Sequence, residues 1–366
     1  MGEDGQASRD GSVAAGAEGI EPLRLGLVGY GLGGRVFHAS LYPAAPVELV
    51  AVASSDAAKV HADHPRARVH ADPAALIADE AVELVVLASP TPTHVPLMLA
   101  AIAAGKHVMS DKPFAPSVAE ADRVIAAAAA AGVIVTCYQN RRRDADFLTL
   151  KRLIEDGALG EITRYRAHFD GWSVPRDRWQ ERDVPGVGVH YDLGAHLFDQ
   201  TLQLFGMPDW IQGDLRRVRP NGTAFDDFHA TMGKGELRIE VSAGLAVADH
   251  RLRYLVHGTR GSWRKSHMDP QEPQLRHEGL AVTDSRYGVE PAAHHGTLTE
   301  IIDGKPVSRT VVSERGDWPS LYADLAHAIR RGEPPPVLAT ESRDAIGLIE
   351  ALIESAEGGR RVALGT

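Results

Sequence analysis

A glycine-rich turn between an apolar run and a helical pattern constrains the fold more than any other feature. Residues 23–42 have the sequence LRLGLVGYGLGGRVFHASLY, with a GxGxxG spacing directly after the apolar run. Glycines allow a tight turn and close approach of a pyrophosphate, and a helix N-terminus offers free N–H groups and partial positive charge. This order predicts a dinucleotide site. We expect the cofactor to contact Gly29, Gly31, Leu32, Gly33 and Gly34.

The chain beyond this turn alternates between strand-like and helix-like segments. Strands are expected in residues 47–55, 66–71, 82–90, 105–115 and 133–139, and helices in 72–80, 93–105 and 117–132. The last helix begins with Ser117 and Glu120 in capping-box spacing and ends at Gly132. The pattern predicts an open parallel sheet with helices on both faces, which binds ligands at the carboxyl ends of its strands.

The end of the second strand bears on the choice of dinucleotide. An NAD site usually has an acid about 20 residues after the last glycine, whereas this chain has Ser54 and Ser55 there. A hydroxyl can donate to a 2′-phosphate that a carboxylate would repel, so the pair favours NADP and serves as a predicted contact. NAD stays open because Asp56 is close enough to replace the acid and no arginine directly follows the serines.

A lysine follows the fifth expected strand in the segment SDKPFAP. Lys112 just past a parallel strand, in a turn stiffened by Pro113, would point into the ligand crevice. The alternative is an ordinary ion pair between Lys112 and its neighbour Asp111.

The segment HYDLGAHLFDQ, residues 190–200, resembles the start of an amphipathic helix. On a helix Asp192, His196 and Asp199 share one face, because residues three and four apart line up. A solvated helix edge would explain this trio, and so would a catalytic role. Gly194 is unfavourable in a helix and could permit close approach of a ligand.

The chain after Leu204 has a different pattern. Short alternating strands such as 228–233, 237–247 and 251–259 fit an antiparallel sheet with one covered face, and two amphipathic helices at 320–332 and 341–359 close the chain. We therefore expect an α/β protein in three parts: a flexible tail over residues 1–22, a doubly wound Rossmann domain over 23–139, and an α+β domain over 140–366.

Composition narrows the class of function. The 366 residues carry a net charge of −10, and NRRRD at 140–144 is the only tight arginine cluster, which argues against nucleic acid as a partner. No apolar run reaches membrane-spanning length, and the N-terminal residues lack the order of a secretory signal. A single cysteine, Cys137, expected in a buried strand, fits a cytoplasmic location. His294 and His295 are adjacent with no third ligand in view, so no metal site is expected.

Several of these segments together resemble the Gfo/Idh/MocA oxidoreductases, and within them the NADP-dependent scyllo-inositol dehydrogenase subgroup. The resemblance spans residues 23 to about 360 and rests on the motifs GLVGYGLGGRVFHA, SPTPTHVPLMLAAIAAGKHVMSDKPFA, NRRRDADFLTLKRLIEDGALGEI and YDLGAHLFDQ, in that order. It implies that the second domain has an open, largely antiparallel sheet, and that the chain forms a homodimer or homotetramer through it.

The resemblance also implies catalytic residues. Lys112 resembles the lysine of the family's EKP motif, with Asp111 in place of glutamate, and Asp192 and His196 resemble the pair on the second-domain helix that faces the nicotinamide. Alcohol oxidation needs a base near neutrality, for which we expect His196. Lys112 would then stabilise alkoxide character and Asp192 would fix the substrate. Ser89, Pro90, Thr91, His94 and Asp111 are implied contacts of the cofactor, although Thr93 in the same segment could simply cap a helix.

The substrate is expected to be a cyclic polyol or sugar. Asn140 and Arg141 after the sixth strand, and Arg176, Arg178 and Trp179 in the PRDRW loop, are candidate pocket residues that could equally have surface or packing roles. Two alternatives to an NADP-dependent dehydrogenase remain: a cofactor-binding sensor or regulator of the same fold, and an enzyme that acts on an amino sugar or an aldehyde.

Overall fold

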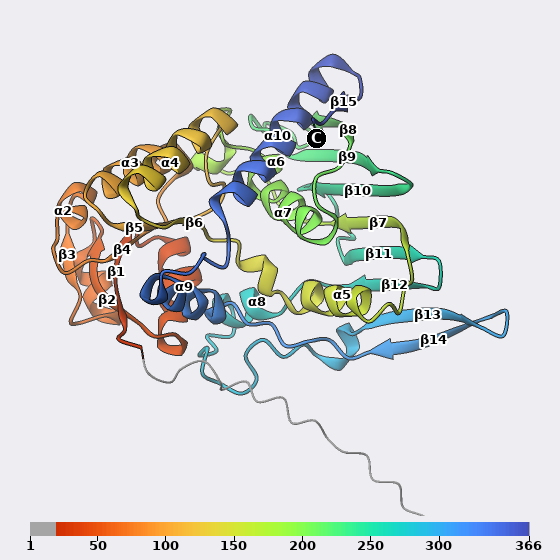
Figure 1. The fold of residues 1–366 in the computed structure, drawn as a ribbon, viewed down its shortest axis with the longest axis horizontal. Helices are drawn as coiled ribbons and strands as arrows, with labels where there is room; N and C mark the ends of the chain where they lie inside the picture. Colours follow the sequence, from red (N-terminus) through yellow and green to blue (C-terminus); the bar gives the residue numbers. More distant parts are fainter. Residues whose placement is uncertain (1–19, 366) are drawn as a thin grey trace, which may run out of the picture.

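Two sheets lie side by side in the computed structural model, which describes residues 20–365 (Figure 1). Residues 1–19, which make up most of the predicted tail, lie outside the described residues. The first sheet, its helices and the glycine turn form one core, and the second sheet with the helices that cover it forms another.

The first sheet is entirely parallel, as predicted. Its strands are β1 (Leu23–Val28), β2 (Val47–Ala53), β3 (Arg68–His70), β4 (Leu84–Leu87), β5 (His107–Ser110) and β6 (Val135–Cys137). Their order β3-β2-β1-β4-β5-β6 is the doubly wound order of a Rossmann domain. Cys137 is fully buried in β6, as predicted from the apolar run around it.

The glycine turn joins β1 to a π-helical turn η1 (Gly33–His38) and a 3₁₀ turn η2 (Ala39–Ala44). Gly29 has a φ of +95°, and a Cβ there would lie 2.8 Å from the carbonyl oxygen of Ala88. A Cβ on Gly34 would lie 2.0 Å from the carbonyl oxygen of Gly29. Both positions therefore require glycine, because no side chain fits between the turn and its neighbours.

Helices cover the two faces of this sheet. They are α1 (Ala57–Asp63), α2 (Pro73–Ile77), the 3₁₀ turn η3 (Thr91–Thr93), α3 (His94–Ala103) and α4 (Val118–Ala131). The Ser117 hydroxyl accepts the N–H of Glu120 at the start of α4, and Gly132 ends it with a φ of +66°, as the sequence predicted.

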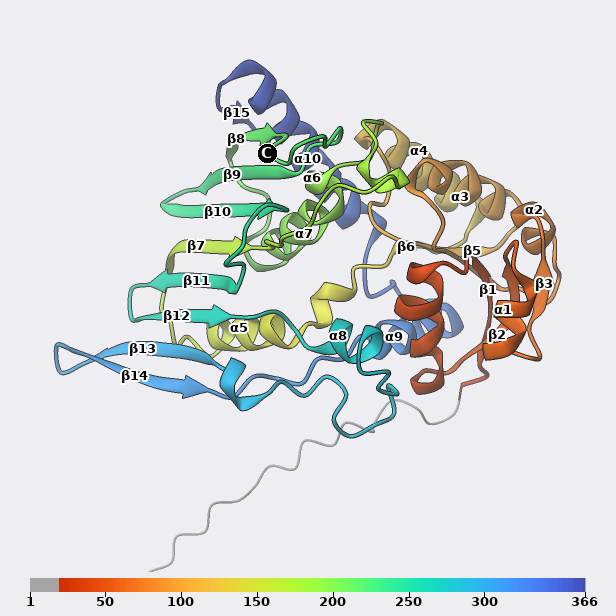
Figure 2. The same ribbon diagram turned by 180° about the vertical axis from the view of Figure 1, so that it is seen from behind.

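The second sheet has nine strands and is mostly antiparallel. Its strands are β7 (Ile162–His168), β8 (Trp210–Arg216), β9 (Asp227–Lys234), β10 (Leu237–Gly244), β11 (Leu252–Gly258), β12 (Gly261–Ser266), β13 (Gly296–Ile302), β14 (Lys305–Val311) and β15 (Val362–Ala363). Their order is β14-β13-β12-β11-β7-β10-β9-β8-β15, and β7 with β10 forms a parallel pair. The β13–β14 hairpin projects beyond the rest of the molecule (Figures 1 and 2).

The remaining helical segments cover this sheet or connect it to the first domain. They are η4 (Asn140–Arg143), α5 (Ala145–Glu155), η5 (Trp179–Glu181), α6 (Val189–Asp192), α7 (Gly194–Phe205), α8 (Gln271–Arg276), η6 (Ala292–His294), α9 (Pro319–Arg331) and α10 (Ala339–Gly358). Side chains of α5, α7 and α10 pack in the second core. Helix α9 instead packs in the first core through Leu321, Tyr322 and Leu325, so the chain returns to the Rossmann domain after the second sheet (Figure 1).

Among the described residues no helix is both long enough and apolar enough to cross a membrane.

Candidate active site

The predicted lysine and aspartate meet where the two domains face each other. Lys112 follows β5 and Asp192 ends α6, and the Lys112 Nζ donates to the Asp192 carbonyl oxygen at 2.8 Å and to its carboxylate. The Lys112 side chain is 19% exposed and that of Asp192 55% exposed, so a ligand can reach both. The alternative expected from the sequence was an ion pair between Lys112 and Asp111. In the structure the Lys112 ammonium contacts Asp192 instead.

His196 lies on α7, one turn after Asp192, and is held in one orientation. Its Nδ1 lies 3.1 Å from the Gln139 Oε1, and the Gln139 amide nitrogen faces the carbonyl oxygen of Ala195 at 3.5 Å. The amide oxygen of Gln139 must therefore accept from Nδ1–H, which leaves Nε2 as the unprotonated nitrogen of the neutral ring. Among the described residues Nε2 has no hydrogen-bond partner, so it is available to accept a proton.

The surroundings keep the His196 imidazole neutral. Burial, together with the positive charges of Lys112, Arg141 and Arg253, lowers the pKa of His196 well below its usual range. The expectation of a base that titrates near neutrality is therefore corrected. The His196 side chain is 4% exposed, and the positive charges that lower its pKa come from other segments of the chain. Residue type alone does not reveal these surroundings.

The helix that carries these residues differs from the single helix that the sequence predicted. It divides at Leu193 into α6 and α7, so Asp192 ends one helix and Gly194 begins the next. A Cβ on Gly194 would meet the rings of Phe228 and Phe198 at 3.4 and 3.5 Å, so these rings pack against the start of α7, and a close approach of ligand at Gly194 stays a prediction.

The third predicted residue of the helix face, Asp199, has a structural role. It accepts from the Arg142 guanidinium at 2.6 and 2.8 Å and is 1% exposed.

A cavity of about 410 Å³ opens at the carboxyl ends of β1 and β2, where the sequence predicted the dinucleotide. Its lining includes Val28, Gly29, Tyr30, Gly31, Ala53, Ser54, Ser55, Asp56, Lys59, Ala71, Pro73 and Ser89. No protein atom lies within 4 Å of a Cβ added at Gly31, so the outer side of the turn has room for a pyrophosphate. The predicted contacts Gly29, Gly31, Ser54, Ser55 and Ser89 thus share one cavity.

The far end of this cavity combines two hydroxyls with one ammonium group. Ser54 and Ser55 lie beside Lys59, whose Nζ donates to the carbonyl oxygen of Tyr30 at 3.1 Å. Asp56 caps α1 by accepting the N–H of Lys59 at 3.0 Å. Asp56, the acid that could have served an NAD site, therefore caps α1. The ammonium of Lys59 lies in the same cavity as Ser54 and Ser55.

The segment after β4 places a histidine where both ring nitrogens face carbonyl oxygens. His94 Nε2 lies 2.8 Å from the Ser89 oxygen and Nδ1 lies 3.1 Å from the Pro113 oxygen, and the side chain is 1% exposed. His94 therefore links the segment after β4 to the segment after β5. Its two ring nitrogens face protein carbonyl oxygens, so His94 supports the cofactor site from behind and does not offer a free nitrogen to a cofactor. Thr91 is buried, whereas Pro90 is exposed beside it.

Thr93 in the same segment does not cap α3 with its side chain. Its hydroxyl donates to the Pro90 carbonyl oxygen and lies 2.6 Å from the Ser89 hydroxyl.

The arginines of the NRRRD segment all form ion pairs. Arg141 contacts Asp144 and Glu272, Arg142 contacts Asp199 and Glu341, and Arg143 contacts Asp324. The Arg141 guanidinium also lies over the Phe169 ring, 4.8 Å from its centroid, and its proposed contact with substrate stays a prediction. Asn140, only 7% exposed, has no side-chain hydrogen bond among the described residues and stays a candidate.

The segment that follows the PRDRW loop contacts the Rossmann domain at Gly186. A Cβ on Gly186, at the end of this loop, would lie 3.0 Å from the Thr91 side chain and 3.3 Å from Pro116, so the loop touches the Rossmann domain. Arg178 pairs with Glu181, and Trp179 begins η5. The proposed contact of Arg176, Arg178 and Trp179 with substrate stays a prediction.

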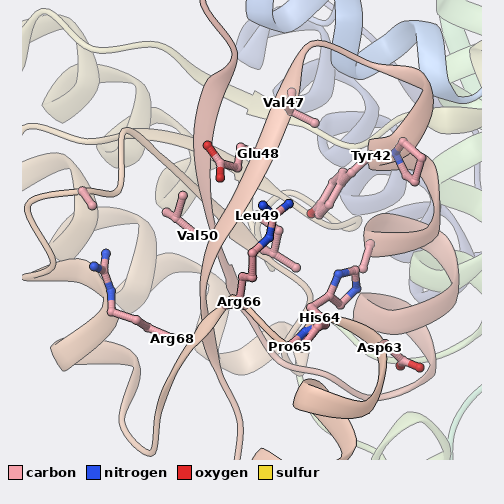
Figure 3. Close-up of a pocket in the computed structure, with 14 residues that line it drawn as sticks. Tyr42, Val47, Glu48, Leu49, Val50, Asp63, His64, Pro65, Arg66 and Arg68 are labelled. Atoms are coloured by element: carbon pink, nitrogen blue, oxygen red, sulfur yellow. The ribbon is translucent and has the colours of Figure 1, made fainter.

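Another hollow, of about 560 Å³, lies at the amino ends of the strands and away from this site (Figure 3). It is lined by residues that include Tyr42, Val47, His64 and Arg66. Parallel sheets bind ligands at the opposite edge, so the smaller cavity is the candidate cofactor site. Within residues 20–365 no cluster of three or more histidine, cysteine, aspartate or glutamate side chains could hold a metal ion.

Sequence reasoning missed three residues near the site. Gln139 lies two residues after β6 and Lys59 lies in the first turn of α1, so both follow the carboxyl ends of strands, where a search for polar side chains would find them. His38 is the third; it gave no signal, because it lies inside an apolar helical pattern.

Comparison with known proteins agrees with this geometry. Residues 23–139 match the oxidoreductase-family NAD-binding Rossmann fold, and residues 151–364 match the family's C-terminal alpha/beta domain. The uncharacterized oxidoreductase YdgJ of Escherichia coli is 39% identical over 92% of this chain and 96% of its own. The scyllo-inositol 2-dehydrogenase (NADP(+)) IolW of Bacillus subtilis is 34% identical over 96% of this chain and 99% of its own.

Solved structures show the same relationship. The oxidoreductase yvaA of Bacillus subtilis superimposes with a TM-score of 0.92 at 34% identity, over 95% of this chain and 99% of that one. A Yersinia pestis oxidoreductase superimposes with a TM-score of 0.89 at 38% identity, over 94% of this chain and 98% of that one. The chain therefore belongs to the Gfo/Idh/MocA oxidoreductase family, with its NAD-binding Rossmann domain and its C-terminal alpha/beta domain.

Proposed function

We propose that the chain is an NADP-dependent dehydrogenase that oxidises a secondary alcohol of a cyclic polyol or sugar, or reduces the corresponding ketone. The observation that carries the proposal is the contact between Lys112 and Asp192, which lies one helical turn before the neutral His196, in a chain with an NAD-binding fold. The Lys112 charge also lowers the pKa of His196, in the same direction as burial of the ring.

Each of the three side chains has a distinct role in this chemistry. The cofactor, when bound, supplies hydride acceptance. His196 Nε2 accepts the hydroxyl proton, since Gln139 holds the proton of the ring on Nδ1. The Lys112 ammonium stabilises the alkoxide oxygen, and Asp192 orients that ammonium through its carbonyl oxygen and carboxylate.

The choice of NADP over NAD rests on the far end of the cofactor cavity. Ser54 and Ser55 offer hydroxyl donors and Lys59 offers a positive charge, while Asp56 is engaged as the cap of α1. A 2′-phosphate gains from all three donors. The relative IolW is named as a scyllo-inositol 2-dehydrogenase (NADP(+)).

The substrate class rests on two kinds of support. IolW is named for scyllo-inositol, and the candidate substrate residues Asn140, Arg176, Arg178 and Trp179 carry polar groups that can hydrogen-bond to ring hydroxyls. An amino sugar or an aldehyde is the alternative substrate, and a sensor without turnover is the alternative function.

Replacement of His196 by Ala tests the catalytic assignment. We expect turnover to fall by about 10²–10⁴-fold, the usual contribution of a general acid–base group, with NADP affinity nearly unchanged. His229→Ala, which removes an exposed histidine from the face of β9, is the matched control. Near-normal turnover of the His196 variant would remove His196 from the mechanism.

We also propose that two copies associate through the second sheet. The projecting β13–β14 hairpin exposes Ile301 by 61%, Ile302 by 51% and Val307 by 46%. Apolar side chains exposed on an edge hairpin favour contact with another chain. Sedimentation of the wild type and of Ile301→Glu tests this proposal, which predicts a lower assembly state for the variant and fails if both are monomers.

A further inference from the structure

A buried histidine outside the proposed catalytic set lies behind the cofactor site. His38 ends η1, the helical turn that begins at the glycine loop, and its side chain is 0% exposed. Its Nδ1 lies 2.5 Å from the Tyr322 hydroxyl. Its Nε2 has no hydrogen-bond partner among the described residues and lies 3.6 Å from Oδ2 of Asp111.

The neighbours of the His38 ring determine where its proton lies. A carboxylate can only accept, so the N–H belongs on Nε2, toward Asp111, and Nδ1 accepts from the Tyr322 hydroxyl. Tyr138 lies against the ring at 4.2 Å between centroids, and Tyr42 packs edge-on against Tyr322 at 5.0 Å. Asp111 is thus the charged group next to the ring, and the other titratable groups around it are tyrosines.

Asp111 stands between the glycine turn and the proposed catalytic lysine. Its Oδ1 accepts the backbone N–H of Lys112 at 2.7 Å, and a Cβ on Gly33 would lie 3.7 Å from its Oδ2. The side chain is 25% exposed. Burial opposes ionisation, yet His38, Lys112 and His94 together lower the pKa of Asp111. The carboxylate is therefore ionised at the edge of the cofactor site.

We propose that His38 is a positioning residue that holds Asp111 as an oriented carboxylate, and that this carboxylate makes the site favour oxidised over reduced cofactor. The inference rests on the proposed function and adds a determinant of redox-state preference to it. The nicotinamide ring is cationic when oxidised and neutral when reduced, so a fixed negative charge nearby stabilises the oxidised form. Loss of the His38 N–H would weaken this preference.

Cofactor binding without substrate tests the proposal on the full chain. The dissociation constants of NADP and NADPH are measured from pH 5 to pH 8 for the wild type, His38→Leu and His38→Gln. For His38→Leu we expect the ratio of the NADP constant to the NADPH constant to rise roughly tenfold, most strongly at low pH. His38→Gln keeps an N–H donor and should restore most of the wild-type ratio.

Two further variants keep the test decisive if His38→Leu does not fold. Asp111→Asn removes the negative charge and should raise the ratio of the NADP constant to the NADPH constant at every pH. Tyr322→Phe removes the hydroxyl that fixes the His38 tautomer and should raise this ratio by a smaller amount. Equal changes in both constants, or an unchanged ratio, would overturn the inference. Absence of turnover on every substrate, with a normal ratio, would count against the proposed function alone.

Discussion

Replacement of His190 by Leu should change how stability depends on pH. His190 lies on α6, two residues before Asp192, is 3% exposed and packs against the rings of Tyr191 and Phe225. Its Nδ1 has no hydrogen-bond partner among the described residues. Burial lowers the pKa of His190 to about 4, although the charge of Asp183 opposes this.

The magnitude follows from the difference between the folded and unfolded chain. An unfolded histidine takes up a proton near pH 6.5, whereas the folded His190 stays neutral until the pH nears its folded pKa of about 4. Between these two pH values the unfolded state therefore binds more protons than the folded state. The free energy of unfolding falls there as the pH drops, by about 1.4 kcal/mol per pH unit. Between pH 7 and pH 5 the contribution of this one group is about 2 kcal/mol.

Chemical denaturation of the wild type and His190→Leu at pH 7, 6 and 5 measures this difference. The free energy of unfolding of the variant, relative to the wild type, should rise by about 2 kcal/mol from pH 7 to pH 5. His277→Leu is the control, because His277 is exposed, and it should leave the pH dependence parallel to the wild type. Parallel curves for His190→Leu would refute the reasoning from burial.

Three further predictions concern the cofactor site and the base. Lys59→Ala should weaken NADP binding about tenfold or more and leave NAD binding within about twofold, as calorimetric titration of each cofactor would show. Gly34→Ala should lower both thermal stability and cofactor affinity, because its Cβ would lie 2.0 Å from the Gly29 carbonyl oxygen. Gly31→Ala should lower cofactor affinity alone, because its Cβ would point into open space. Because the pKa of His196 lies below its usual range, kcat/KM for alcohol oxidation should stay flat as the pH falls below 6.5, and a pH profile with a decline near 6.5 would contradict this.

The sequence predicted best what is encoded locally. The glycine turn, the caps of α4 and the parallel strands around them depend on neighbouring residues, and the structure confirms them. Lys112, Asp192 and His196 were identified through family motifs, and the fold brings the first two into direct contact.

Properties that depend on distant residues could not be predicted. His196 and Gln139 are 57 positions apart, and the tautomer of the histidine depends on that contact. The pKa of His196 depends on cations from three other segments, and the packing of Gly194 depends on Phe228 in β9. Helix α9 lies within the match to the C-terminal domain, residues 151–364, and its apolar side chains pack in the first core, a contact that position in the sequence does not reveal.

The most direct test of the proposed function is the near-ultraviolet absorbance of reduced nicotinamide while the purified protein is mixed with NADP or NAD and a panel of inositols, hexoses and their keto forms. We expect turnover with a cyclic polyol or its ketone, faster with the NADP couple than with the NAD couple. Tight NADP binding with no turnover on any member of the panel would contradict it and favour a sensor of the same fold.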